Sequence, residues 1–167
     1  RTMTMRCIST RILLMIFATT ILIPNQRAAA EDGFKKLFDG STLKGWRGDP
    51  AHWSVRDGAI VGSTKPNGRK SNTFLIADGE YADFVLRAKF KHASGASGIQ
   101  FRSRRLGDPG EFRVTGYQAD IGGGDLGTFY EEQGRGTIVA SNYKKLKPFV
   151  NEGDWNRYEI RAVGGQF

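Results

Sequence analysis

The sequence predicts an all-β fold, a two-sheet antiparallel sandwich, from three observations. Short segments in which apolar and polar residues alternate dominate the chain after residue 50. The 167 residues include 22 glycines, all from Gly33 onward, which is typical of a chain that turns often. No segment keeps a helical period over three turns, and only residues 142–150 suit a single turn of helix. Strands with one apolar and one polar face are what two packed sheets require.

Individual strands follow from the alternation and from the turn residues between them. Residues 53–56 and 59–61 are expected to form a hairpin, because the intervening Asp57-Gly58 suits a turn with positive φ. In the clearest strand, residues 83–91, one face is apolar and carries Phe84, Leu86, Ala88 and Phe90. Further strands are expected at residues 72–76, 97–103, 116–121, 127–131, 136–139 and 155–163.

The first 30 residues have the features of a secretory signal peptide. Arg6 and Arg11 precede an apolar run at residues 12–23, and a small-residue site ends at Ala30. The apolar run is too short for a membrane anchor, which needs about 20 residues. We therefore expect cleavage after Ala30, a secreted or periplasmic location, and a mature domain at residues 31–167 without a stable membrane span.

The net charge of +8 does not indicate a nucleic-acid-binding protein. Half of this excess comes from four arginines in the first 30 residues, and the later basic clusters are short and separate. The single cysteine, Cys7, lies inside the expected signal peptide, so the mature domain would be stable without disulfides. The sequence does not indicate an oligomeric state.

Three short motifs point to chemistry but lack its structural context. Residues 122–127 match G-x-G-x-x-G, yet the following residues continue as a strand rather than as the helix that a dinucleotide site needs. Residues 95–99 lack the final glycine of a nucleophile elbow. His52 and His92 stand alone, without the spacing of a metal site.

A set of polar residues shares one face of the expected sheet. On neighbouring strands this face carries Gln100 and Arg102, then Gln118 and Asp120, then Tyr130 with Glu131 or Glu132. Amides, a guanidinium and carboxylates at fixed positions, with aromatic rings beside them, suit the hydroxyls and flat apolar surfaces of a sugar. The alternative is a face that simply meets water, as in many antiparallel sheets.

Residues 37–46, Leu-Phe-Asp-Gly-Ser-Thr-Leu-Lys-Gly-Trp, resemble the opening signature of the 3-keto-disaccharide hydrolase family. The similarity continues in order through residues 53–55, 57–60, 84–90, 97–103, 116–121 and 153–156. Each segment is weak alone, but the ordered series covers nearly all of residues 34–167 and is specific. The resemblance implies a concanavalin A-like jelly-roll sandwich. It also implies an exported enzyme that cleaves glycosides already oxidised at C3 of the sugar.

This implied activity sets requirements for the site. A C3 ketone acidifies the proton on C2, so that a base can remove it and expel the C1 substituent, after which water adds to the enone. By residue type and face, Asp120 is the candidate base or metal ligand, with Glu132 as its alternative. Arg102 is the candidate electrophile toward a keto or enolate oxygen. The residues expected to orient hydroxyls are Gln100, Gln118 and Tyr130. Whether a divalent metal takes part is left open.

The chain departs from the family pattern in two places. Gly116 stands where similar members often carry Glu, and Phe167 precedes the strand in which members carry a Leu-Gln-x-His-like element. Residues 163–167 read as the start of a hairpin, so we expect a sandwich that is incomplete at its C-terminus, and an inactive fragment if that histidine participates. Two other functions stay open: a non-catalytic carbohydrate-binding module, and a structural domain of a larger assembly.

Overall fold

A computed structural model describes residues 33–65, 68, 71–108 and 110–167. The expected signal peptide, residues 1–30, and its cleavage site lie outside the described residues. The chain divides into two units, Arg1–Lys35 and Lys36–Phe167, and every strand described below belongs to the second.

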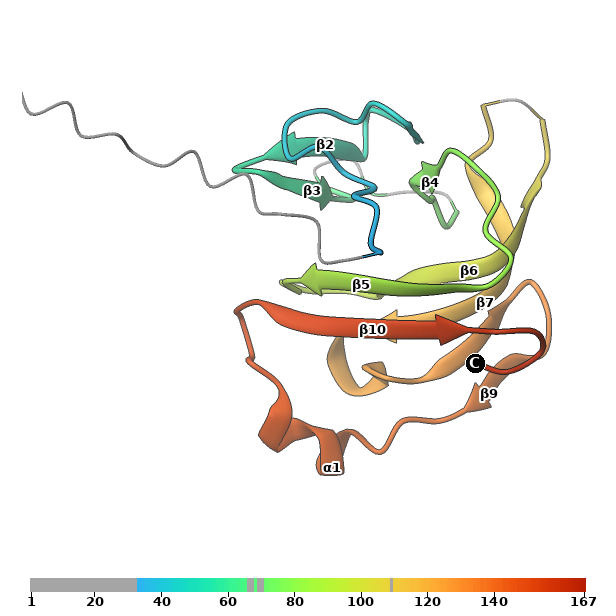
Figure 1. Cartoon of the computed structure of the whole chain (residues 1–167). Helices are drawn as coiled ribbons and strands as arrows, with labels where there is room; N and C mark the ends of the chain where they lie inside the picture. The colour runs from blue at the N-terminus through green and yellow to red at the C-terminus, as the bar shows by residue number, and fades with distance from the viewer. Residues whose placement is uncertain (1–32, 66–67, 69–70, 109) are drawn as a thin grey trace, which may run out of the picture. The chain divides into compact units, whose positions relative to one another are not determined.

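The largest sheet has four antiparallel strands in the order β6-β7-β8-β9 (Figure 1). These strands are β6 (Ser97–Leu106), β7 (Arg113–Ile121), β8 (Phe129–Glu132) and β9 (Gly136–Val139). A second antiparallel pair joins β5 (Phe84–Phe90) to β10 (Asn156–Ala162), and Figure 1 shows this pair lying across the larger sheet. The short elements are β1 (Trp46–Arg47) paired with β4 (Ile76–Ala77), the 3-10 turns Gly123–Asp125 and Lys147–Phe149, and α1 (Tyr143–Leu146).

The apolar core lies between these two layers. Its buried centre is Phe101 from β6 with Ile160 and Ala162 from β10. Partly buried apolar residues from both layers pack against this centre: Phe84, Leu86, Ile99, Tyr117, Ala119 and Phe129. The rings of Phe84 and Phe101 meet edge to face across the layers, with centroids 6.3 Å apart. The prediction of an all-β antiparallel sandwich is therefore confirmed.

The hairpin predicted around Asp57-Gly58 is also present. Strand β2 (Trp53–Arg56) pairs with β3 (Ala59–Gly62), and Arg56 lies opposite Ala59. Asp57 and Gly58 have φ values of 50° and 74°, as a two-residue turn with positive φ requires. The single helical turn expected within residues 142–150 is found as α1, whose first turn is capped by the Asn142 side chain. None of the helices in the described part of the chain is long and apolar enough to cross a bilayer.

The opening signature folds into a local structure that holds itself together. The Asp39 carboxylate accepts hydrogen bonds from the Thr42 hydroxyl and from the backbone N–H groups of Thr42 and Ser41, the latter two at 2.7 Å. The Thr42 hydroxyl above all, with these N–H groups, lowers the pKa of Asp39 to about 2. The Trp46 indole donates to the Leu37 carbonyl at 2.8 Å. These contacts give the signature a structural role.

Residues 122–127, which match a dinucleotide-binding pattern, connect two antiparallel strands. The backbone runs from β7 through the 3-10 turn Gly123–Asp125 into β8, and the β7 and β8 strands are antiparallel neighbours. A dinucleotide site needs a parallel strand and a helix at this position. The interpretation of this segment as an inter-strand loop is therefore confirmed.

Candidate active site on the outer face of the four-stranded sheet

Most of the polar residues expected on one face, with Arg102 and Glu131 as exceptions, gather on the side of the four-stranded sheet that points away from the core. Gln100 on β6 lies opposite Gln118 on β7, and Gln118 lies opposite Tyr130 on β8. Asp120 is two residues further along β7, so its side chain has the same orientation as that of Gln118. The alternate residues, such as Phe101 and Tyr117, face the core. Alternation along the strands thus separates a packing face from a polar face.

A chain of side-chain hydrogen bonds connects three of these residues. Gln100 Nε2 donates to Gln118 Oε1 at 2.9 Å, and Gln118 Nε2 donates to Asp120 Oδ1 at 2.6 Å. The Ser103 hydroxyl lies 3.2 Å from Gln100 Oε1 and 3.1 Å from the carbonyl oxygen of Phe101. Gln100, Gln118 and Asp120 are therefore one connected unit.

Asp120 is a partly buried carboxyl with a raised pKa. Burial is the main cause, and the negative charges of Asp125 and Glu132 raise the pKa further. The hydrogen bond from Gln118 acts in the opposite direction, because it stabilises the ionised form. A raised pKa makes the ionised carboxyl a stronger base than an exposed aspartate.

Glu132 lies on the same face and is buried. It stands opposite Gly116 in the β7–β8 register, and its side chain accepts a hydrogen bond from Asn72 Nδ2 at 3.1 Å. Glu131 is oriented the other way: it lies opposite Tyr117 and forms an ion pair with Arg135 at 2.5 Å. Of the two neighbouring glutamates, only Glu132 belongs to the polar face.

Arg102 is not part of this group, and here the expectation is corrected. Its Nη2 lies 3.2 Å from Asp83 Oδ1 and 3.0 Å from the carbonyl oxygen of Gly164, next to the ends of β5 and β10. The cause is a bulge between Phe101 and Arg104, within which Arg102 has a φ of 51°. A bulge interrupts the two-residue period and turns the side chain away from the face that alternation predicts. Arg102 therefore ties the two layers together instead of facing Asp120.

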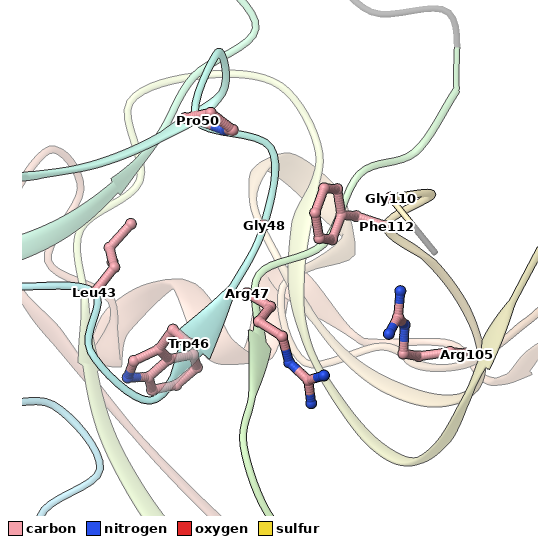
Figure 2. A pocket seen from close by; sticks show the side chains of 8 residues that line it. All are labelled: Leu43, Trp46, Arg47, Gly48, Pro50, Arg105, Gly110 and Phe112. Atoms are coloured by element: carbon pink, nitrogen blue, oxygen red, sulfur yellow. The ribbon is translucent and has the colours of Figure 1, made fainter. Parts of the chain in front are cut away.

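Two open pockets lie elsewhere on the protein. Figure 2 shows the first, of about 560 Å³, with Trp46, Arg47, Arg105 and Phe112 among its lining residues. The second has a volume of about 510 Å³ and polar walls that include His52, Asn72, Glu111 and Arg113. Neither pocket includes Gln118 or Asp120, so the polar face expected to suit a sugar does not coincide with either pocket. Asn72 connects the second pocket to Glu132.

Sequence reasoning missed residues whose importance depends on the bulge or on backbone proximity. Ser103 reaches Gln100 because of the bulge, and Asn72 reaches Glu132 across 60 positions of sequence. Gly98 and Gly116 were also missed, although the sequence carries a signal for them. Each precedes a glutamine of the polar face by two residues, so that Gly-x-Gln occurs on both paired strands, at Gly98 with Gln100 and at Gly116 with Gln118. Among the described residues, no group of three or more His, Cys, Asp or Glu side chains is arranged to hold a metal ion.

Comparison with known proteins gives this geometry a context. A family model described as a 3-keto-alpha-glucoside-1,2-lyase-like domain matches residues 33–167. The chain is also similar to a 3-keto-disaccharide hydrolase of Bacteroides thetaiotaomicron, with 38% identity over 66 residues. That alignment covers 36% of this chain and 21% of the relative, so it spans about a fifth of the relative's length. The resemblance in the sequence is thus confirmed, and the chain belongs to the 3-keto-alpha-glucoside-1,2-lyase-like domain family.

Proposed function

We propose that this protein cleaves 3-keto-disaccharides and related 3-keto-glucosides, with Asp120 as the base. The observation that carries the proposal is the Asp120 carboxyl on the polar face of the sheet, with a pKa raised by burial and one oxygen held by Gln118. The family and the name of the bacterial relative support the substrate class.

The proposed reaction proceeds by elimination and hydration. Ionised Asp120 takes the C2 proton, which the neighbouring C3 ketone acidifies, and the electron pair forms a C1–C2 double bond as the C1–O bond breaks. Protonated Asp120 gives up this proton to the solvent, and the leaving oxygen takes up a proton from the solvent. Water then adds across the enone, with its oxygen at C1 and a proton at C2, and Asp120 is again ionised. The sum is hydrolysis of the glycosidic bond. General base catalysis of this kind contributes about 10²–10⁴-fold to a rate.

Other residues of the polar face would bind and orient the sugar. Tyr130 lies opposite Gln118 in the sheet and supplies a hydroxyl and an aromatic surface for a sugar ring. Glu132 is the alternative base, but Asn72 and Gln133 already donate to its Oε1, at 3.1 and 3.4 Å. Glu132 is also only 5% exposed, whereas Asp120 is partly buried and therefore more accessible to a substrate, which favours Asp120 over Glu132 for proton abstraction.

The decisive experiment follows the C2 proton. The protein is incubated with 3-keto-trehalose or a 3-keto-glucoside in D₂O, and the released 3-keto-glucose is examined by mass spectrometry and NMR at early times. Elimination and hydration leave one deuterium at C2, in excess of the slow exchange of the same sugars without protein. Sugar release without C2 deuterium would overturn the mechanism, and saturable binding without release would overturn the enzymatic function.

Export is part of the same proposal. The basic start, apolar run and small-residue site of residues 1–30 support a cleaved signal peptide. N-terminal sequencing of the protein recovered from the periplasm or medium should begin at Glu31. Recovery of the unprocessed chain from the cytoplasm alone would contradict this.

The alternative function is non-catalytic carbohydrate binding. The pocket in Figure 2 favours it, because Trp46 and Phe112 supply flat apolar surfaces and Arg105 supplies a charged donor. Under this alternative, Trp46→Ala weakens saturable glycan binding, no sugar is released, and Asp120→Asn leaves binding unchanged.

A further inference from the structure

We propose that Gln100 is a positioning residue that fixes the orientation of Gln118 and, through Gln118, of the Asp120 carboxylate. The inference rests on the proposed role of Asp120 as the base. It is carried by the consecutive hydrogen bonds from Gln100 to Gln118 and from Gln118 to Asp120, at 2.9 and 2.6 Å. Neither of these bonds joins Gln100 directly to Asp120, so an effect of Gln100 on the carboxylate has to pass through Gln118.

The chain of bonds has only one consistent direction. An ionised carboxylate only accepts hydrogen bonds, so Gln118 must turn its NH₂ group toward Asp120 and its oxygen toward Gln100. Gln100 then has to donate, and its own oxygen faces the Ser103 hydroxyl at 3.2 Å. If Gln100 could not donate, Gln118 Oε1 would lose its partner, and the Gln118 side chain would be free to move away from the carboxylate.

Two glycines provide the space for this arrangement. A Cβ atom at Gly98 would lie 2.4 Å from Gln118 Cγ and 2.9 Å from its Nε2, so the Gln118 side chain lies directly over the Gly98 backbone. A Cβ atom at Gly116 would lie 2.7 Å from Ser103 Oγ, and Gly116 has a φ of 126°, which favours glycine. Backbone with no side chain therefore flanks both ends of the amide chain.

The functional consequence is that the two carboxylate oxygens of Asp120 have different roles. Oδ1 is held by Gln118, which prevents the carboxylate from rotating, while Oδ2 has no hydrogen-bond partner in the described chain. A base fixed in this way presents one oxygen to the substrate in a constant direction. Such pre-positioning lowers the entropic cost of reaching the transition state.

The test measures Asp120 directly, without substrate. The carboxyl carbon of Asp120 is followed by ¹³C NMR as the pH is raised, in the wild type, Gln118→Leu, Gln100→Leu and the double variant. Loss of the Gln118 bond should raise the pKa of Asp120, because that bond stabilises the ionised form. Gln100→Leu should raise it by a smaller amount. In the double variant, Gln100→Leu should add nothing to the effect of Gln118→Leu.

This cycle separates a relay from two independent contributions. An unchanged Asp120 titration in Gln100→Leu, or additive effects in the double variant, would overturn the proposal. Gln166→Leu is the matched control, because Gln166 lies in the C-terminal turn outside the polar face. In Gln166→Leu, the Asp120 carboxyl should titrate as it does in the wild type. Thermal unfolding of each variant confirms that the NMR is recorded on folded protein.

Turnover then distinguishes this proposal from the proposed function. If both hold, Gln100→Leu lowers kcat for a 3-keto-glucoside about 10-fold with little change in KM, as expected when a hydrogen bond near a charged group is lost. A non-additive NMR cycle in a protein that releases no sugar would support the relay and reject the enzymatic function. Unchanged kcat in Gln100→Leu alongside full turnover in the wild type would reject the positioning role alone.

Discussion

The two faces of the four-stranded sheet are built from the same strands but do different work. On the core side, Phe101 is 7% exposed and packs against the β5–β10 layer. On the outer side, Gln100 and Gln118, whose neighbours along the strands face the core, form the hydrogen bonds that reach Asp120. Consecutive residues along a strand therefore alternate between the packed core face and the polar outer face. Substitutions on the two faces should therefore affect different measurements.

The largest expected effect is on activity and comes from the outer face. Asp120→Asn keeps the shape of the side chain but removes the proposed base, so kcat for a 3-keto-glucoside should fall about 10²–10⁴-fold. The melting temperature should change little, because the residue does not belong to the core. Steady-state kinetics and thermal unfolding measure the two quantities. Full turnover in Asp120→Asn would reject Asp120 as the base.

The corresponding change on the core face is Phe101→Ala. Phe101 lies in ring contact with Phe84, Tyr117, Phe129 and Phe167, and truncation would leave a cavity among these rings. Removal of a buried Phe side chain costs about 3–5 kcal/mol of unfolding free energy. Urea unfolding measures this loss. A destabilisation below about 1 kcal/mol would show that the two layers are not held together at this point.

Gly98→Ala tests how closely the backbone approaches the polar face. The added methyl would clash with the Gln118 side chain, at 2.4 Å from its Cγ, and displace the amide from Asp120. We expect kcat/KM to fall about 10-fold, which is the effect of losing about 1.4 kcal/mol of transition-state stabilisation. Gly165→Ala is the matched control, since nothing lies within 4 Å of a Cβ atom at that position. Equal activity of the two variants would contradict the close approach.

How much of this arrangement the sequence could predict differs between the two faces. Apolar alternation correctly placed Phe84 and Leu86 in the core, and the same period placed Gln100, Gln118 and Asp120 together. The predicted position of Arg102 on the polar face was wrong because a bulge adds residues to β6. No local sequence pattern marks where the alternation is interrupted. The hydrogen bond from Asn72 to Glu132 joins residues that are far apart in the sequence, and local periodicity carries no information about such long-range contacts.

Arg102→Gln measures how much the contacts of the Arg102 guanidinium contribute to the free energy of unfolding. The guanidinium joins Asp83 and the Gly164 carbonyl, both exposed, and sits on the side of the sheet that faces the β5–β10 layer. The substitution should lower the free energy of unfolding by about 1 kcal/mol, the upper range for an exposed ion pair. Turnover at a temperature where the variant is folded should be close to wild type. A loss of activity as large as that of Asp120→Asn would return Arg102 to the chemistry.

The smallest effect is a difference in the pH dependence of stability between two aspartates. The pKa of Asp120 is raised in the folded protein, so the native state binds the proton more tightly than the unfolded chain. Its contribution to stability is therefore present below the unfolded value of 3.8 and is lost as the pH rises through the folded pKa. Asp39 has the opposite sign: with a folded pKa of about 2, its contribution is present above 3.8 and lost as the pH falls toward 2. Urea unfolding from pH 2 to 7 should show that Asp120→Asn removes a fall in stability with rising pH, whereas Asp39→Asn removes a gain. The same sign for both variants would mean that burial does not govern the Asp120 carboxyl.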